Sequence, residues 1–305
     1  MKYLITGGTG FVGKHLIPNL IAKGADILVL TRDVIKSQRL FGDKVTSITN
    51  LKEISDNEQI YCIINLAGEP IADKKWSETQ KALLLSSRVN ITEDIIALIS
   101  RLNQKPHSMI SASAIGYYGC QADNVIYEDS QPINEFTHQL CEAWENEAIK
   151  AEKFGTRVCI TRFGVVLGKE GGALAKMLPP FRLGLGGNIG SGMQYFSWVH
   201  INDLIRAIDF FITHSECSGI FNLTSPNAVT NQTFASTLAD VLHRPAFFDM
   251  PAFICTLLFG EMGDRLLLHG QRVYPKRLID LGFKFEFEDL ESALKNLLIK
   301  NTEFL

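Results

Sequence analysis

Apolar residues along this chain follow two alternating patterns. Short continuous runs, such as Tyr3-Leu4-Ile5, are typical of strands buried on both faces of a parallel sheet. Longer segments place an apolar residue every three or four positions, which is typical of helices with one buried face. The pattern predicts strands at residues 3–5, 25–30, 45–48, 61–66, 109–114, 158–160 and 220–223, and helices at 11–23, 77–100, 135–154, 204–212, 230–242 and 289–299.

Strands that alternate with helices predict an α/β fold, here a doubly wound parallel sheet (Rossmann) with a smaller C-terminal substrate lobe. We expect residues 1–168 to form the Rossmann domain, with residues 195–225 returning to it. Residues 169–194 and 226–305 are expected to form the smaller lobe and a helical C-terminal extension. The glycines at 171–172, 184–187 and 190–192 predict flexible turns that line or cover a pocket, and the alternation Phe283-x-Phe285-x-Phe287 predicts a half-buried strand.

Charge and cysteine content exclude several classes of partner. The 305 residues carry a formal charge of −3 and no basic cluster, which argues against nucleic acid or an anionic membrane as the main partner. No stretch approaches the ~20 apolar residues of a membrane span, and Gly7 ends the first apolar run too early for a signal peptide. The six cysteines lack the spacing of zinc sites, so we expect no metal and a reducing, cytoplasmic location.

Three glycines follow the first predicted strand, with the spacing Gly7-x-x-Gly10-x-x-Gly13, and a helix begins directly after them. Glycines let the backbone approach a pyrophosphate, and the free N–H groups and dipole of the helix N-terminus stabilise its charge. The position between strand and helix therefore predicts a dinucleotide site. We expect the cofactor to contact Gly7, Thr9, Gly10, Phe11, Val12 and Gly13, and also Leu66, Ala67 and Gly68 after the fourth strand.

The residues after the second strand bear on the choice between NAD and NADP. A carboxylate at this place selects the ribose 2′-hydroxyl of NAD, whereas an arginine accommodates the 2′-phosphate of NADP. Here the strand is followed by Thr31, Arg32 and Asp33. Because Arg32 can bind a phosphate bidentately, the sequence favours NADP (NADPH), with Thr31 beside it. Asp33 keeps NAD open as the less favoured alternative.

Several motifs together resemble the extended short-chain dehydrogenase/reductases. They are Thr6-Gly7-Gly8-Thr9-Gly10-Phe11-Val12-Gly13, Asn65-Leu66-Ala67-Gly68, Ser111-Ala112-Ser113 with Tyr117-Tyr118-Gly119, and Arg162-Phe163-Gly164-Val165-Val166-Leu167-Gly168. Further pieces are similar to an NAD-dependent epimerase/dehydratase-like subfamily, the sugar-nucleotide epimerase-like proteins, whose C-terminal extension has no assigned function. These pieces are Glu69-Pro70-Ile71-Ala72 with Trp76, Gly190-Ser191-Gly192-Met193-Gln194, Ser197-Trp198-Val199-His200 and Gln271-Arg272-Val273-Tyr274-Pro275.

The resemblance implies catalysis by a serine and a Tyr-x-x-x-Lys pair, in which the lysine lowers the pKa of the tyrosine. No tyrosine of this chain has a lysine four residues later, and the helix at 135–154 contains no tyrosine. The pair would fall at Phe136 or Thr137 and at Leu140 or Cys141. We therefore expect Ser113 with Tyr117 or Tyr118 to be the catalytic residues. His200, Glu69 and His15 are expected to be structural, and Arg88 and Asn90 to be surface or interface residues.

These observations leave three functional hypotheses open. The first is an NADP-dependent oxidoreductase or epimerase-like enzyme with a substitute acid/base, acting on a small, sugar-derived substrate. The second is an NADPH-binding regulatory or redox-sensing protein without turnover, and the third a structural subunit with a vestigial cofactor site. The resemblance also implies a homodimer that pairs through the helices at 77–100 and 135–154.

Overall fold

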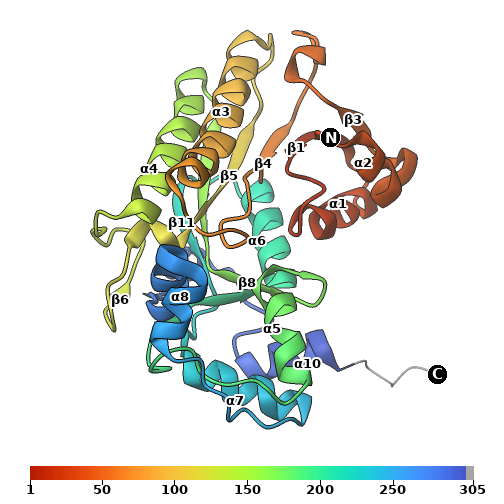
Figure 1. Cartoon of the computed structure of the whole chain (residues 1–305). Coiled ribbons are helices and arrows are strands. Elements are labelled where there is room, and N and C mark those ends of the chain that lie inside the picture. Colours follow the sequence, from red (N-terminus) through yellow and green to blue (C-terminus); the bar gives the residue numbers. More distant parts are fainter. Residues whose placement is uncertain (300–305) are drawn as a thin grey trace, which may run out of the picture.

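Seven parallel strands form the central sheet, in the order β11-β7-β5-β4-β1-β2-β3 (Figure 1). The computed structural model describes residues 1–299, so the end of the predicted C-terminal extension, 300–305, lies outside the described residues. The strands are β1 (Lys2–Thr6), β2 (Asp26–Leu30), β3 (Thr46–Ile48), β4 (Cys62–Asn65), β5 (Ser108–Ala114), β7 (Arg157–Phe163) and β11 (Gly219–Leu223). Each overlaps a segment predicted as a strand, and the doubly wound fold class is confirmed.

Helices cover both faces of the sheet and bury separate apolar clusters. On one face, α1 (Gly13–Ala22) and α6 (Ile201–Thr213) pack on the strands. On the other face, α3 (Glu78–Arg101) packs on the strands, as does the end of α4 (Phe136–Ala148). The winding reverses at β1, which has β2 on one side and β4 on the other. In doubly wound sheets such a reversal opens a ligand-binding crevice at the carboxyl ends of the strands.

A third apolar cluster lies in the C-terminal part, outside the seven-stranded sheet. It joins α5 (Gly172–Arg182), α7 (Asn231–Leu242) and α10 (Leu290–Leu298), which Figure 1 shows together below the sheet. The helix α8 (Ala252–Gly263) packs Met262 in one cluster with Leu84 of α3 and Leu140 of α4. The remaining elements are α2 (Val34–Phe41), α9 (Lys276–Asp280), β6 (Val125–Ile126), β8 (Val165–Gly168), β9 (Tyr195–Phe196), β10 (Trp198–His200), β12 (Val229–Thr230) and β13 (Arg272–Val273). The C-terminal region is thus present, while its predicted boundaries at 169–194 and 226–305 stay predictions.

The strand predicted from Phe283 to Phe287 is wrong. The alternating phenylalanines are buried, with exposed fractions of 7–9%, but within the described residues this segment joins no sheet. Instead, the backbone N–H groups of Glu286 and Phe287 each donate to the carboxylate of Asp203, at 2.8 Å. Asp203 is itself fully buried in α6. Its carboxylate therefore satisfies the backbone groups that a neighbouring strand would otherwise satisfy.

His200 is a buried, neutral cap of α6. Its Nδ1 accepts from the backbone N–H of Asn202 at 3.0 Å, and its ring stacks on Phe287 with centroids 3.9 Å apart. The side chain is 1% exposed, and burial lowers its pKa to about 4 from the usual 6.5. This placement agrees with the structural role that the sequence predicts for His200.

Acidification is expected to destabilise the protein through His200. Between pH 6.5 and pH 4 the unfolded chain binds a proton at this residue and the native protein does not, so stability falls as pH falls. The contribution is about 2–3 kcal/mol between pH 7 and pH 4.5. Urea unfolding at both pH values should show this loss in the native protein and a smaller one in His200→Asn, whose side chain can still cap the helix. Equal losses in the two proteins would contradict the assignment.

Candidate cofactor cleft and catalytic site

The glycine turn between β1 and α1 is closely packed against neighbouring backbone. Gly7 has a positive φ of +67°, and a Cβ there would lie 2.5 Å from the carbonyl oxygen of Leu66. A Cβ on Gly13 would lie 2.4 Å from the carbonyl oxygen of Gly8. Gly10 donates its N–H to the oxygen of Gly7 at 2.9 Å and closes the turn. Only glycine satisfies these positions without displacing backbone, and the turn leads directly into the N-terminus of α1.

Buried polar side chains join this turn to the end of β4. Thr6 donates its hydroxyl to Asn65 Oδ1 at 2.6 Å, and the amide of Asn65 donates to Thr92 of α3 at 2.9 Å. The N–H of Ala67 lies 3.3 Å from the Thr6 hydroxyl. The expected cofactor residues Leu66, Ala67 and Gly68 are therefore held beside the glycine turn, at the carboxyl ends of β1 and β4.

Phe11, in the glycine motif, packs against a second set of glycines. Its ring touches the positions of Gly168, Gly171 and Gly172, where an added Cβ would approach ring atoms to 2.5, 2.5 and 3.0 Å. These glycines form the turn between β8 and α5. The turn predicted at 171–172 thus lies against a predicted cofactor residue, although α5 begins directly at its end.

In the loop after β2, Arg32 and Asp33 are both exposed, and Asp33 caps the next helix with one of its carboxylate oxygens. The Asp33 carboxylate accepts the N–H of Lys36 at 2.8 Å and caps α2, and the Thr31 hydroxyl bonds within the same loop. Arg32 is exposed and forms no ion pair within the described residues. The side chain that would select NAD is therefore engaged in capping, while the guanidinium that would select NADP is available.

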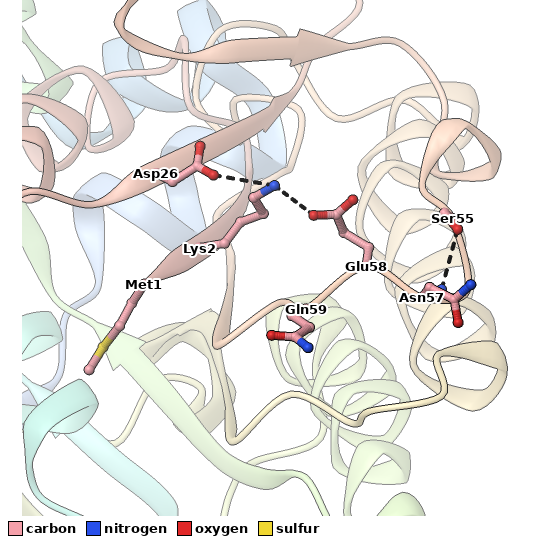
Figure 2. Close-up of a pocket in the computed structure, with 7 residues that line it drawn as sticks. All are labelled: Met1, Lys2, Asp26, Ser55, Asn57, Glu58 and Gln59. Atoms are coloured by element: carbon pink, nitrogen blue, oxygen red, sulfur yellow. Dashed lines mark hydrogen bonds and ion pairs between the residues drawn. The ribbon is translucent and has the colours of Figure 1, made fainter.

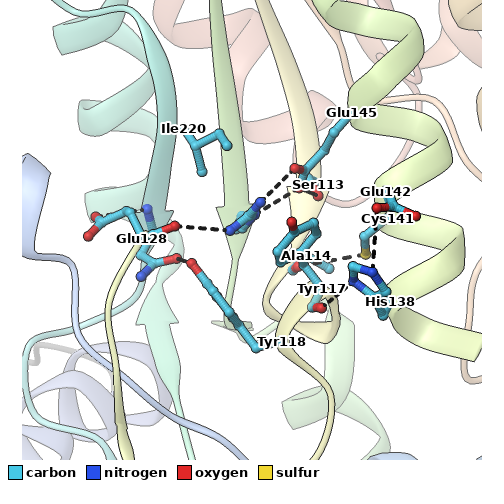
Figure 3. Close-up of polar contacts among 12 residues, drawn as sticks. Ser113, Ala114, Tyr117, Tyr118, Glu128, His138, Cys141, Glu142, Glu145 and Ile220 are labelled. Carbon is cyan, nitrogen blue, oxygen red and sulfur yellow. Dashed lines mark hydrogen bonds and ion pairs between the residues drawn. The ribbon is translucent and has the colours of Figure 1, made fainter. Parts of the chain in front are cut away.

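Ser113 lies at the carboxyl end of β5, and the two tyrosines follow it in a short helical turn, Ile115–Tyr118 (Figure 3). Tyr117 is partly exposed, and its backbone oxygen contacts His138 Nδ1 at 2.8 Å. Tyr118 is completely buried and donates its hydroxyl to Asn222 Oδ1 at 2.6 Å. Burial raises the pKa of Tyr118 to about 12. Of the two tyrosines, Tyr117 is thus the one open to a ligand.

A buried ion pair lies directly beneath Ser113 and Tyr117. Arg162 donates Nε to Glu145 Oε1 at 2.8 Å and Nη2 to Oε2 at 2.7 Å. Ser113 donates its hydroxyl to the same Oε1 at 2.5 Å. The guanidinium carbon of Arg162 lies 3.3 Å from the centroid of the Tyr117 ring and 4.9 Å from that of Tyr118. The pair therefore connects the three residues that the sequence predicts to be catalytic.

The face of α4 toward β5 carries no replacement for the tyrosine–lysine pair. Thr137 packs on Gly116, where an added Cβ would lie 3.2 Å away, and the Cys141 thiol contacts the oxygen of Ala114 at 3.7 Å. Both are buried, and burial raises the pKa of the Cys141 thiol to about 11. Glu145 follows at the same helical spacing and is the ionisable group that bonds to Ser113.

The apolar pattern did not identify Glu145 or His138 as candidate site residues. Both lie on α4, and only Arg162 stood in a quoted motif. The guanidinium of Arg88 lies beneath Gly68 and donates to the oxygens of Leu84 and Glu69 at 2.9 and 3.0 Å. Burial lowers the pKa of Arg88. Arg88 is partly exposed and supports the β4 loop, while Asn90 is exposed, and a subunit interface at either residue stays a prediction.

A surface hollow at the opposite end of the sheet is a poorer candidate. Figure 2 shows it near the start of β1, where Lys2 Nζ lies 2.6 Å from Glu58 and 3.2 Å from Asp26. Ligands of doubly wound sheets bind at the carboxyl ends of the strands, and this hollow lies at the amino ends. Among the described residues no group of three or more His, Cys, Asp or Glu side chains could hold a metal, and no helix is long and apolar enough to span a membrane.

A model of the NAD dependent epimerase/dehydratase family matches residues 3–224, which include the glycine turn, Ser113 and Arg162. The chain belongs to this family. A second model, a domain of unknown function (DUF1731), matches residues 250–297, from the start of α8 to α10. The epimerase/dehydratase match thus contains the central sheet and the candidate cofactor site.

Relatives in this family match the chain over nearly its whole length. The epimerase family protein YfhF of Bacillus subtilis is 38% identical over 303 residues, 98% of each chain. The crystal structure of the human epimerase family protein SDR39U1 (isoform 2) with NADPH has a TM-score of 0.87 and 33% identity, over 97% of this chain and 99% of the human one. A nucleoside-diphosphate sugar epimerase from Corynebacterium glutamicum has a TM-score of 0.77 and 27% identity, over 98% of this chain and 58% of its own.

Proposed function

We propose that the protein binds NADPH in the cleft between β1 and β4 and transfers hydride between this cofactor and a small, sugar-derived substrate. The observation that carries the cofactor is the loop after β2, where Asp33 caps α2 and Arg32 is free for a 2′-phosphate. The human relative solved with NADPH supports the same choice. The nucleoside-diphosphate sugar epimerase among the relatives supports a sugar-derived substrate.

Ser113 and Tyr117 are proposed to contact the reacting oxygen of the substrate. They lie at or just after the end of β5, whose carboxyl end neighbours that of β4, and this supports a position near the nicotinamide. Tyr117 is the substitute acid/base in this proposal, with the Arg162 cation against its ring to stabilise negative charge on the phenolic oxygen. Tyr118, enclosed and bonded to Asn222, supports the turn from below.

The direct test is NADPH oxidation by the purified chain with a panel of sugar nucleotides, ketones and aldehydes. We expect at least one carbonyl compound to be reduced, and both Ser113→Ala and Tyr117→Phe to lower the activity at least about a hundredfold. Loss of NADPH absorbance without substrate, or activity that survives both changes, would contradict the assignment of these residues.

Cofactor choice gives a separate prediction. Arg32→Ala is expected to weaken NADPH binding by about ten- to a hundredfold, since a charged hydrogen bond contributes about 1.5–3 kcal/mol. NADH binding should change little because NADH has no 2′-phosphate. Fluorescence titration of both cofactors measures the two affinities, and Arg39→Ala, at the exposed end of α2, is the matched control. An equal loss for both cofactors would contradict binding of the 2′-phosphate by Arg32.

A second function, NADPH binding without turnover, is favoured by one observation. Thr137 and Cys141 occupy the helical face where the tyrosine–lysine pair would lie, and neither provides a cation next to Ser113. Tight NADPH binding, with no compound of the panel reduced, would support this regulatory function.

In either case we propose a homodimer that pairs through α3 and α4, and a cytoplasmic location. Sedimentation tests the first point and cell fractionation the second.

A further inference from the structure

The hydrogen of the Ser113 hydroxyl has a fixed direction. Its acceptor is Glu145 Oε1, at 2.5 Å, and the same carboxylate accepts two hydrogen bonds from Arg162. Bidentate contact with a guanidinium favours the ionised form of a carboxylate, which has no hydrogen to donate. Ser113 is therefore the donor in this bond.

This bond determines what Ser113 can offer to a ligand. A hydroxyl group has one hydrogen and two lone pairs. With its hydrogen directed at Glu145, Ser113 presents only lone pairs to the cleft. A carbonyl oxygen, which only accepts, gains no hydrogen bond from such a serine. A hydroxyl group can donate to it.

Burial prevents the network from exchanging its partners with water. The exposed fractions of Ser113, Glu145 and Arg162 are 3%, 8% and 1%. Turning the Ser113 hydrogen toward the cleft would leave a strong acceptor site on the buried carboxylate unfilled, which is unfavourable in a water-free environment. The tyrosine turn also restrains Arg162, because its guanidinium is stacked on Tyr117. The direction of the hydrogen is thus a property of the fold, set before a ligand binds.

We propose that Glu145 is a positioning residue that holds Ser113 as a hydrogen-bond acceptor, so that the site takes the hydroxyl form of its substrate through an O–H···Ser113 bond. The inference rests on the proposed function for the place of the ligand. It leaves Tyr117 as the group that donates to the carbonyl form. The site is therefore more complementary to an alcohol with NADP⁺ than to a ketone with NADPH.

Neutron diffraction tests the direction of the hydrogen without any substrate. In deuterium-exchanged crystals of the full chain with NADP⁺, we expect a deuteron on Ser113 Oγ that points to Glu145 Oε1, and no deuteron on the carboxylate. A deuteron on Glu145, or a Ser113 deuteron that points into the cleft, would overturn the proposal. Either result leaves the proposed cofactor and reaction standing, so the two failures are distinguishable.

Kinetics with 1-phenylethanol and acetophenone as the probe pair test the consequence. Glu145→Gln leaves one acceptor oxygen where the carboxylate had two. With that oxygen on Arg162 Nη2, the amide NH2 group lies at Ser113 and donates to it, so the Ser113 hydrogen can turn to the cleft. We expect the ratio of KM for acetophenone to KM for 1-phenylethanol to fall about tenfold, the value of one hydrogen bond. Glu147→Gln, a buried glutamate on the same helix that pairs with Lys150, is the control and should leave the ratio unchanged. Equal ratios in both variants would overturn the proposal, and if neither probe turns over or the variant does not fold, the neutron result decides.

Discussion

Replacing Arg162 with methionine is expected to lower the free energy of unfolding by about 3–5 kcal/mol. Arg162 is 1% exposed. Its loss would leave the Glu145 carboxylate buried without its cation, with the hydrogen bond from Ser113 remaining. A buried charge without its partner is strongly destabilising, because water no longer solvates it. Urea unfolding at pH 7, followed by circular dichroism, measures the change.

Two further variants separate the buried charge from a general effect of removing an arginine. Arg101→Met breaks a partly exposed ion pair with Asp56 and should cost below about 1 kcal/mol. Adding Glu145→Leu to Arg162→Met removes both charges and should recover at least half of the loss. If Arg162→Met were no more harmful than Arg101→Met, the ion pair would not stabilise the fold.

Most strands were predictable because they contain a short apolar run, and the parallel sheet follows from burial on both faces. The helix α2 was not predicted, since it is only eight residues long with its apolar residues at the two ends, and its N-cap by Asp33 has no distinctive spacing. The Phe283-x-Phe285-x-Phe287 alternation indicated the buried side correctly. Periodicity cannot show, however, whether the backbone N–H and C=O groups form hydrogen bonds with a neighbouring strand. Here they find the carboxylate of Asp203, distant in the sequence.

The catalytic region shows a different limit. Ser113 and the tyrosines could be picked out because Ser111-Ala112-Ser113 with Tyr117-Tyr118-Gly119 resembles the strand that carries the catalytic serine of short-chain dehydrogenase/reductases. Tyr117 and Tyr118 are neighbours with the same chemistry, and only the structure shows that Tyr118 is enclosed. The pair of Glu145 with Arg162 joins α4 to β7, and no local pattern relates a helical acid to a strand base. Contacts between elements of this kind depend on packing and not on spacing.

The choice between NAD and NADP also depended on a contact that the sequence pattern does not show. Thr31, Arg32 and Asp33 favoured NADP but left NAD open, because an acid and a base were both present after the strand. The structure adds the hydrogen bond from the N–H of Lys36 to Asp33, which gives the acid a capping role. A helix that begins at Val34 was needed for that conclusion, and this helix was not predicted.

Tyr117→Phe is expected to reduce kcat for carbonyl reduction by about 10²- to 10⁴-fold, the usual effect of losing a general acid. Phenylalanine keeps the ring on which Arg162 stacks, so the turn and the ion pair should be preserved. NADPH affinity should be unchanged, since the hydroxyl is proposed to contact the substrate and not the dinucleotide. Stopped-flow NADPH oxidation with the best substrate of the panel measures kcat, and fluorescence titration measures the affinity.

Two other tyrosines make the test specific to Tyr117. Tyr127→Phe alters an exposed ring beside Tyr274 and should change neither kcat nor stability. Tyr118→Phe removes the hydrogen bond to Asn222 and leaves a buried acceptor, so it should lower stability by about 1–3 kcal/mol while kcat falls far less than in Tyr117→Phe. The reverse order, with kcat sensitive to Tyr118 and not to Tyr117, would transfer the acid/base role to the enclosed residue. It would also require the turn at 115–118 to open during catalysis, because the hydroxyl of Tyr118 is 2.6 Å from Asn222 and the residue is fully buried in this structure.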